Sequence, residues 1–329
     1  MSLTLITNDR SFRINIQSKP SFVGGQGQVY GVRLPKYGDC VLKIYKSQEK
    51  ADKIRDKILY LMQQKTPHVN DNIRFCWPIG AVFDTDTHAF KGYVMLKAFP
   101  ESRDLTILEA YSPKESIAQL FPDDTKWHDK FELKSLSGIK NRLKILYNWI
   151  VAIEALHATR KYILGDIKPE NVLVTPTGKI SIIDIDSCQI CDNGKLKFEC
   201  DAKTPNYFPA EAYNMSKRHI PLNYQCDSFA IGCCIYSILI GCHPFTNIRL
   251  LPPYNNGNYS TISSRIKASL YYRGSNSKYV ERIPALDLHA NLDQLSPQLI
   301  NLFDRCFIGH SNRPTMTEWR EAIKHQIYH

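Results

Sequence analysis

The side chains best suited to chemistry in this chain are gathered in one short segment, Gly165–Asn171. This segment contains a carboxylate at Asp166, an ammonium at Lys168 and an amide at Asn171, and a second carboxylate, Asp184, follows the next apolar run. A carboxylate can orient an attacking hydroxyl, a cation can neutralise phosphate charge, and amide and carboxylate oxygens are ligands that Mg²⁺ accepts. The set therefore predicts transfer of a phosphoryl group from ATP.

These groups must be positioned by a sizeable fold, and the chain is long enough to form one. Its 329 residues suffice for one large domain or two packed lobes. A hydrophobic fraction of 43% and a charged fraction of 22% are typical of soluble globular proteins. We find no apolar run long enough to span a bilayer and no signal-peptide pattern in residues 1–16. These features predict a cytoplasmic protein without a membrane span.

The charge and the cysteines allow simple interpretations. The net charge is +10, but the basic residues are scattered and no stripe interleaves them with aromatic residues. This favours a solvated basic surface and no nucleic-acid partner, although composition leaves an acidic partner as an alternative. The ten cysteines fall mostly in apolar stretches, which predicts buried thiols in a reducing compartment.

The apolar periodicity changes along the chain. The first hundred residues favour strands and one helix, Gln48–Gln64, whereas helical stripes dominate from about Phe99 onward, as in 139–160 and 227–239. The predicted strands are Arg13–Ile16, Val29–Val32, Cys40–Tyr45, Pro78–Phe83 and Gly92–Leu96. The pattern predicts an α+β fold, in which a five-stranded lobe with one helix is joined to a larger helical lobe.

Several motifs, in order, resemble those of eukaryotic-type protein kinases. They are the glycine-rich turn Gly24–Tyr30, the strand lysine Lys43, the loop at Asp166, the segment Thr204–Glu211, the helix start Asp227–Gly232 and Arg313. The resemblance covers roughly residues 20–325. It implies the two-lobed kinase fold, with residues 1–96 as the N-lobe and 97–329 as the C-lobe. It also implies ATP and Mg²⁺ as cofactors, with Mn²⁺ as an alternative to Mg²⁺.

The resemblance assigns a nucleotide site. Gly24 and Gly27 would let backbone N–H groups approach the phosphates, and Lys43 would hold the α- and β-phosphates while pairing with a helix carboxylate. Among Glu49, Asp52 and Asp56, the position of Asp56 fits that carboxylate best. The adenine pocket would be built from Val29, Val41 and Leu173, with Met95 at its back and the backbone of Leu96–Ala98 binding the base.

The resemblance also assigns the catalytic groups. Asp166 would be the catalytic base, Lys168 would steady the transferring phosphate, and Asn171 and Asp184 would hold magnesium. Thr204 would hydrogen-bond near Asp166 and Lys168, and Glu211 would pair with Arg313. Asp227 would be a structural acid that is paired or that caps backbone N–H groups.

The sequence departs from the family pattern at three places. Phe22 stands at the first glycine, Leu164-Gly165 replace the usual His-Arg, and Ile185-Asp186 replace the usual Phe-Gly. Without that Arg, activity is expected to be independent of activation-segment phosphorylation. Asp186 is either a further metal ligand or a turn-forming residue.

Lys168, two residues after Asp166, is typical of Ser/Thr kinases, and several motifs resemble a divergent bacterial group associated with phosphatase and tellurite-resistance genes. The expected function is therefore phosphorylation of Ser or Thr hydroxyls in an unidentified protein. One alternative is a pseudokinase that binds nucleotide or proteins without catalysis, and another is a small-molecule kinase. Cys188 and Cys191 are expected to be unlinked thiols, with a redox switch as the alternative.

Overall fold

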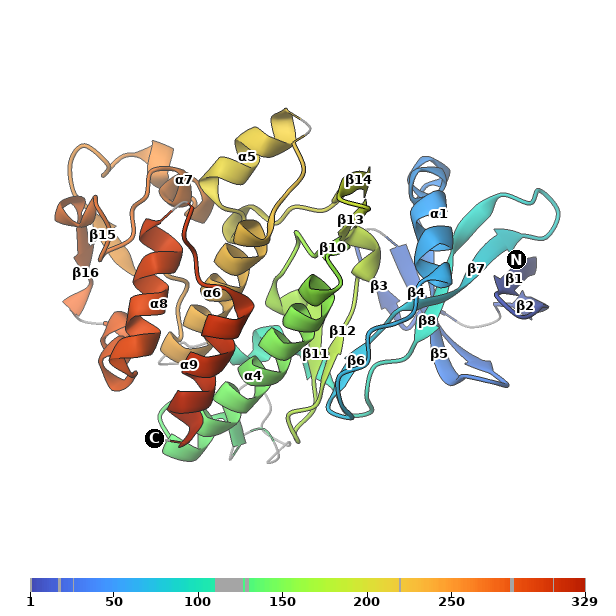
Figure 1. Cartoon of the computed structure of the whole chain (residues 1–329), viewed down its shortest axis with the longest axis horizontal. Coiled ribbons are helices and arrows are strands. Elements are labelled where there is room, and N and C mark those ends of the chain that lie inside the picture. The colour runs from blue at the N-terminus through green and yellow to red at the C-terminus, as the bar shows by residue number, and fades with distance from the viewer. Residues whose placement is uncertain are drawn as a thin grey trace. The chain divides into compact units, whose positions relative to one another are not determined.

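The computed structural model of the chain describes residues 2–16, 19–25, 27–109, 127, 130–218, 220–284, 287–309 and 311–328 (Figure 1). The chain forms two compact units. The first unit contains Met1–His68, Arg74–Phe99 and Ser181–Asp186, and the second contains Val69–Ile73, Pro100–Ile180 and Ser187–His329. Within the described ranges, no helix combines the length and the apolar character that a membrane crossing requires.

The first unit is built on an antiparallel sheet with the strand order β2-β1-β7-β8-β5-β4-β3. The strands are β1 (Ser2–Thr7), β2 (Ser11–Asn15), β3 (Phe22–Val23), β4 (Gly27–Leu34), β5 (Gly38–Tyr45), β7 (Pro78–Asp84) and β8 (Phe90–Leu96). All five predicted strands are present, but the described sheet has seven, so the prediction of five was wrong. The missed β1 alternates buried Leu3, Leu5 and Thr7 with more exposed residues and pairs with both β2 and β7.

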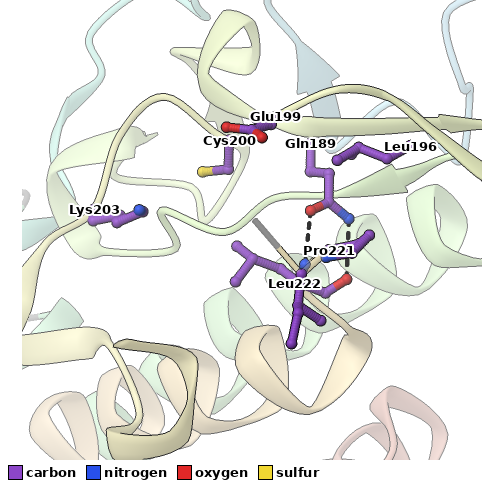
Figure 2. A pocket seen from close by; sticks show the side chains of 8 residues that line it. Gln189, Leu196, Glu199, Cys200, Lys203, Pro221 and Leu222 are labelled. Atoms are coloured by element: carbon purple, nitrogen blue, oxygen red, sulfur yellow. Dashed lines mark hydrogen bonds between the residues drawn. The ribbon is translucent and has the colours of Figure 1, made fainter. Parts of the chain in front are cut away.

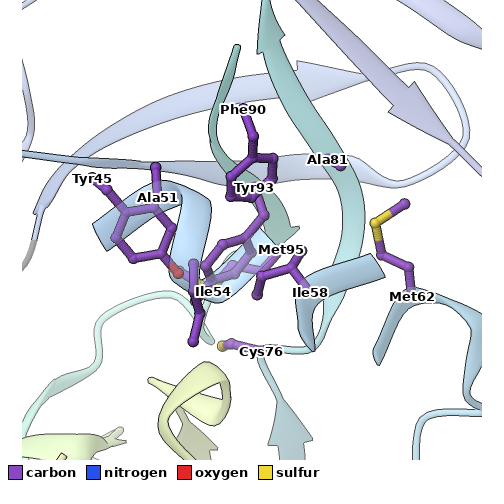
Figure 3. Close-up of a cluster of buried hydrophobic side chains, with 10 residues drawn as sticks. All are labelled: Tyr45, Ala51, Ile54, Ile58, Met62, Cys76, Ala81, Phe90, Tyr93 and Met95. Carbon is purple, nitrogen blue, oxygen red and sulfur yellow. The ribbon is translucent and has the colours of Figure 1, made fainter. Parts of the chain in front are cut away.

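One helix, α1 (Gln48–Gln63), covers one face of this sheet (Figure 1). Its N-cap Ser47 accepts a hydrogen bond from the Lys50 N–H, which satisfies one of the unpaired donors of the first turn. Its apolar stripe, which includes Ile54 and Ile58, packs against aromatic and sulfur-containing side chains of β5 and β8 (Figure 3). The opposite sheet face buries a second cluster, which includes Leu5 and Leu42. Apolar side chains are thus buried on both faces of the sheet.

The second unit is mostly helical, as predicted. Its helices are α4 (Leu136–Ala158), α5 (Ala210–Lys217), α6 (Tyr224–Ile240), α7 (Ile262–Lys267), α8 (Pro297–Ile308) and α9 (Met316–Tyr328) (Figure 1). Helix α6 is buried from Cys226 to Ile240, as its nearly uninterrupted apolar sequence predicts. It begins at the N-cap Asn223 and ends at Gly241, whose φ of 93° is the left-handed conformation that glycine adopts without strain.

Short strands complete the second unit. Strands β10 (Tyr162–Ile163), β13 (Gln189–Asp192) and β14 (Lys195–Phe198) form one small sheet. Strand β9 (Arg103–Asp104) pairs with β11 (Val172–Val174), and β15 (Ile248–Leu250) pairs with β16 (Val280–Arg282). The chain passes between the two units within β6 (Ile73–Phe75) and β12 (Ile180–Ile182). The proposed lobes, 1–96 and 97–329, stay a prediction.

Candidate active site

The first unit contains a buried cluster of charges around Lys43. The strand register places Lys43 on β5 between Val29 of β4 and Tyr93 of β8. Its ammonium lies 2.9 Å from Asp184 Oδ1 and 3.0 and 3.1 Å from the two carboxylate oxygens of Asp186. Burial opposes the charge on Lys43, but both carboxylates outweigh this effect and hold its pKa above the ordinary value. The lysine is therefore a charged, doubly paired group.

The prediction that Asp56 pairs with Lys43 is wrong. Asp56 is exposed and its Oδ1 accepts from Arg55 Nε at 3.0 Å, while Glu49 and Asp52 are exposed as well. The apolar stripe of α1 faces the sheet, so its acidic residues are turned to solvent. The carboxylates that pair with Lys43 come instead from the segment after β12.

Asp186 was expected to be a further metal ligand or a turn-forming residue, and the structure places it in a turn. It lies in a short 3₁₀ turn, Ile185–Ser187, but its side chain is buried and accepts hydrogen bonds from Tyr45 Oη at 2.7 Å and Tyr93 Oη at 2.9 Å. Burial alone would raise the pKa of this carboxyl, but Lys43 and the two hydroxyls lower it below its ordinary value. The two tyrosines are site residues that the sequence analysis missed. The signal was Tyr45, two residues from Lys43 and so on the same strand face.

The second unit brings together Asp166, Lys168, Asn171 and Thr204. Thr204 Oγ1 donates to Asp166 Oδ1 at 2.6 Å and accepts from Lys168 Nζ at 2.9 Å. Lys168 Nζ lies 3.0 Å from Asp166 Oδ2, and Asn171 Nδ2 donates to the Asp166 carbonyl at 2.8 Å. The predicted hydrogen bonds of Thr204 are confirmed. The base candidate Asp166 is thus held in a fixed orientation by three neighbours.

The backbone before Asp166 is anchored by Asp227. Its carboxylate accepts from the N–H groups of Leu164 and Gly165, both at 2.8 Å, and contacts His157 Nε2 at 2.8 Å. This confirms Asp227 as a buried, structural acid. Gly165 has a φ of 67°, and a Cβ there would lie 2.6 Å from Cys200 Sγ. The glycine that replaces the usual Arg is therefore required by the local backbone and its packing.

The predicted magnesium ligands have suitable chemistry, although one lies in each unit. The Asn171 amide nitrogen is used by Asp166, with a second contact to Oδ2 at 3.2 Å, so its oxygen is the atom that remains for a metal. The Asp184 side chain is 37% exposed and its φ is 56°, an uncommon conformation for a residue other than glycine. An amide oxygen and an accessible carboxylate fit the ligand preference of Mg²⁺.

The glycine-rich turn connects β3 to β4. The Gly24 N–H donates to the Gly27 carbonyl at 3.0 Å, which closes the turn, and Gln26 lies outside the described residues. A Cβ on Gly27 would lie 2.5 Å from the Ile44 carbonyl oxygen, so this glycine allows β4 to approach β5 closely. Apart from its chain neighbours, no described residue has an atom within 4 Å of the Cβ position of Gly25.

The predicted adenine-binding residues are divided between the units. Val29, Val41, Met95, Leu96 and Ala98 belong to the first unit, and all but the buried Met95 are partly buried. Leu173, partly buried on β11, belongs to the second unit. In the predicted Leu96–Ala98 segment, the Lys97 N–H donates to the Asp39 carbonyl and the Lys97 carbonyl accepts from Arg74. Both backbone polar groups of Lys97 are thus engaged within the first unit.

The segment between Ser187 and Glu211 has structure that the sequence did not predict. Strands β13 and β14 form a hairpin, and Gln189 fastens it by accepting from the Leu222 N–H at 2.7 Å and donating to the Leu222 carbonyl at 3.0 Å (Figure 2). The pocket beside it, which Cys200 and Lys203 also line, has a volume of about 30 Å³. Ligand pockets typically have volumes of about 300–1,000 Å³, so this pocket is too small for a nucleotide.

The end of this segment is fastened at three points. Tyr207 Oη donates to Glu109 Oε1 at 2.9 Å, and His243 Nε2 donates to the Asn206 carbonyl at 3.0 Å. Glu211 pairs with Arg313, which confirms the predicted ion pair. Burial raises the pKa of Glu109 to about 7, although the hydrogen bond from Tyr207 opposes this shift. Burial lowers the pKa of His243 to about 3, so its ring is neutral.

The cysteines agree with the simpler prediction. None of the ten cysteines forms a disulfide, and this includes Cys188 and Cys191. Among the described residues, no group of three or more His, Cys, Asp or Glu side chains is arranged to hold a metal ion. A cysteine-based zinc site is therefore not formed by these residues.

Comparison with known proteins agrees with this geometry. The family model described as the protein kinase domain matches residues 94–327, which include Asp166, Asn171 and Asp184. Citron rho-interacting kinase of Rattus norvegicus is 26% identical over 162 residues, which are 48% of this chain and 7% of that protein. Serine/threonine-protein kinase MRCK gamma of Homo sapiens is 34% identical over 164 residues, 47% of this chain and 10% of that protein.

A third relative, serine/threonine-protein kinase MRCK alpha of Mus musculus, is 30% identical over 174 residues, 47% of this chain and 10% of that protein. The chain thus spans a tenth or less of the length of these relatives. The family match begins after Lys43 and the glycine-rich turn, so within the first unit it covers only residues 94–99 and 181–186. The match nevertheless covers more than half of the chain, and it includes the cluster around Asp166. The chain belongs to the protein kinase domain family.

Proposed function

We propose that this protein transfers the γ-phosphoryl group of Mg-ATP to serine or threonine hydroxyls of a protein substrate. The observation that carries the proposal is the cluster of Asp166, Lys168, Asn171 and Thr204 in the second unit. Lys43 and Asp184 supply the complementary groups in the first unit. The names of the relatives support the choice of serine or threonine as acceptor.

Each residue has one task in the proposed reaction. Asp166 accepts a hydrogen bond from the acceptor hydroxyl, orients it and takes its proton. Lys168 neutralises charge on the phosphoryl group while it moves, and Lys43 binds the phosphates that stay with the nucleotide. Within the second unit, hydrogen bonds hold Asp166 and Lys168 together before substrate binds, so these two side chains need little reorganisation in the transition state.

Magnesium would be held by the amide oxygen of Asn171 and the carboxylate of Asp184. Bound there with ATP, the ion would supply positive charge that neutralises the phosphates. The adenine would lie against Val29, Val41 and Leu173, with Met95 behind it and the Leu96–Ala98 backbone as hydrogen-bonding edge. Gly24 and Gly27 would keep the turn above the phosphates narrow.

The finer assignments also belong to this proposal. The motifs around Gly165-Asp166 and Asp184-Ile185-Asp186 support a place in the divergent bacterial, tellurite-resistance- and phosphatase-associated group of Ser/Thr kinases. We further propose a cytoplasmic location, because the sequence has neither an apolar run long enough to span a bilayer nor a signal-peptide pattern in residues 1–16. We also propose a protein substrate, and no nucleic-acid partner because the basic residues are scattered.

Nucleotide binding and transfer are tested separately. A thermal-shift titration with Mg-ATP should raise the melting temperature with concentration, because a ligand that binds only the folded state stabilises it. Transfer is then measured with a mixed Ser, Thr and Tyr peptide substrate. Binding without transfer would instead support the pseudokinase alternative, and phosphotyrosine as the sole product would contradict the choice of acceptor.

A further inference from the structure

Lys43 is a buried ammonium that receives no carboxylate from the neighbouring helix α1. Its side chain is 6% exposed, and an unpaired ammonium in such a place would be very costly. Helix α1 lies over the same sheet face, but its buried residues are apolar apart from Lys57, and its three acids are exposed. The compensating negative charge therefore has to come from elsewhere.

Asp186 supplies that charge with its orientation fixed. Its Oδ1 accepts from Lys43 at 3.1 Å and Tyr93 Oη at 2.9 Å, and its Oδ2 accepts from Lys43 at 3.0 Å and Tyr45 Oη at 2.7 Å. Both oxygens thus accept two hydrogen bonds. The donors come from two adjacent strands, β5 and β8, so the carboxylate cannot rotate without breaking several of them.

The two tyrosines are themselves held by packing. Their ring centroids are 6.3 Å apart, and both rings lie in the buried cluster between α1 and the sheet (Figure 3). The Lys43 ammonium also lies 5.6 Å from the Tyr45 ring centroid and 5.8 Å from that of Tyr93, within the range of a cation–π interaction. Helix α1 therefore acts on Lys43 through the rings it packs against and not through a carboxylate.

The two carboxylates near Lys43 differ in exposure. The Asp184 side chain is 37% exposed, whereas that of Asp186 is 3% exposed. Asp184 can therefore turn toward a metal, while Asp186 is enclosed by protein. If Asp184 moved to a metal, Lys43 would keep one buried carboxylate of opposite charge and would remain compensated.

We propose that Asp186, oriented by Tyr45 and Tyr93, is the positioning residue that holds Lys43 for phosphate binding, in place of a helix carboxylate. The inference rests on the proposed function, because it gives Lys43 its task there. The proposal also changes which segment controls the position of Lys43. A shift of the segment 184–187 would release Lys43, whereas a shift of the acidic face of α1 would not.

The test is a double-mutant cycle with Asp186→Asn and Lys43→Met in the full chain. Calorimetry measures Mg-ADP affinity, and urea denaturation measures stability without ligand. We expect Asp186→Asn to weaken Mg-ADP binding on the order of 10- to 100-fold when Lys43 is present, the range typical of losing a supporting partner. In the Lys43→Met background it should cause no further loss, and the two shifts in denaturation midpoint should not add.

Equal weakening in both backgrounds would show that Asp186 acts independently of Lys43 and would overturn the inference, as would no weakening at all. Asp56→Asn is the matched control, since it removes an exposed acid of α1, and should leave affinity unchanged. If Asp186→Asn does not fold, Tyr45→Phe combined with Tyr93→Phe removes only the two hydroxyls. That variant should weaken Mg-ADP binding in the Lys43 chain and not in the Lys43→Met chain, and any other pattern would contradict the inference.

The experiment separates this inference from the proposed function. The wild-type chain could bind nucleotide and show a coupled cycle but transfer no phosphoryl group. That result would refute the proposed function and leave Asp186 as the positioning residue. Normal transfer by the wild type with an uncoupled cycle would leave the proposed function intact and remove the role of Asp186.

Discussion

At the scale of single residues, the chain compensates the charges of two lysines, each within its own unit. Lys43 is neutralised by Asp184 and Asp186 in the first unit, and Lys168 is paired with Asp166 in the second. Each ammonium lies next to a carboxylate with a distinct proposed task. This arrangement leads to two predictions about individual side chains.

Asp166→Asn should lower kcat on the order of 100- to 10,000-fold while leaving nucleotide affinity almost unchanged. The change removes the proton acceptor but keeps the shape and most hydrogen bonds of the side chain. Steady-state kinetics and a Mg-ATP thermal shift, measured on the same preparation, check both parts. Asp192→Asn, which alters a partly exposed acid 3.6 Å from Lys197, serves as control. A large loss of nucleotide affinity in Asp166→Asn would contradict the assigned role.

Activity should not depend on phosphorylation of the segment that contains Ser187 and Thr204. Ser187 is buried, and the Thr204 hydroxyl already bridges Asp166 and Lys168, so a phosphate on either would disturb existing contacts. Turnover of untreated protein, phosphatase-treated protein and the Ser187→Ala variant should agree within a few-fold. If dephosphorylation abolished turnover while the protein stayed folded, the segment would be a phosphorylation switch after all.

Sequence reasoning found the residues that its motifs contain and missed those that only packing brings together. Asp166 and Thr204 could be connected because their motifs are recognisable. The partner of Lys43 could not be identified, because the choice among acids depends on which face of α1 is buried. Position along the chain favoured Asp56, but the apolar stripe of the helix turns that residue to solvent.

At the scale of elements, the loop before Asp166 is shaped by a glycine. Gly165→Ala should lower the free energy of unfolding by about 1–2 kcal/mol because of the left-handed backbone. The overlap of the new Cβ with Cys200 and Leu222 should lower it further. Gly194→Ala is the control, because Gly194 also has a positive φ, 76°, but nothing lies within 4 Å of its Cβ position. Urea denaturation should show the larger loss at Gly165. Equal losses would contradict the packing argument.

Glu109 should make stability depend on pH. Its pKa in the folded chain is raised to about 7 from an ordinary 4.5, so the folded state binds the proton more tightly. The contribution of Glu109 to the stability of the folded state is therefore most favourable below about pH 4.5. It declines as the pH rises to about 7 and is then constant. The full decline is at most about 3 kcal/mol. Glu109→Gln should thus melt higher than wild type at pH 8, and the difference should shrink toward pH 5. Parallel melting curves across this range would refute the assignment.

Helices with a long apolar periodicity were predictable from the sequence. Short strands that form only by pairing with another strand were not. Helices α1, α4 and α6 lie close to their expected ranges because each carries a stripe or a continuous apolar surface. The hairpin β13–β14 was missed because its four-residue strands are too short for a clear alternation. Gln189, which fastens it, does so through backbone groups that sequence does not reveal.

At the scale of the whole molecule, the α+β fold and the protein kinase family were predictable because several motifs occur in the right order. The number of strands in the first sheet was not, and the domain boundary stays a prediction. The two compact units assign residues 69–73, 97–99 and 181–186 differently from a single cut after residue 96. Segment 181–186 carries Asp184 and Asp186. The ion pairs of Lys43 with these two residues therefore form only because the chain returns to the first unit after residue 180.

The proposed function is tested most directly by one measurement. The wild-type chain and Asp166→Asn are incubated with γ-labelled ATP, Mg²⁺ and a mixed peptide substrate, and the labelled amino acids are identified. We predict magnesium-dependent phosphoserine or phosphothreonine from the wild type and almost none from the variant. Nucleotide binding with no labelled product from the wild type, or equal product from both proteins, would contradict the proposal that this kinase-family chain is a catalyst acting through Asp166.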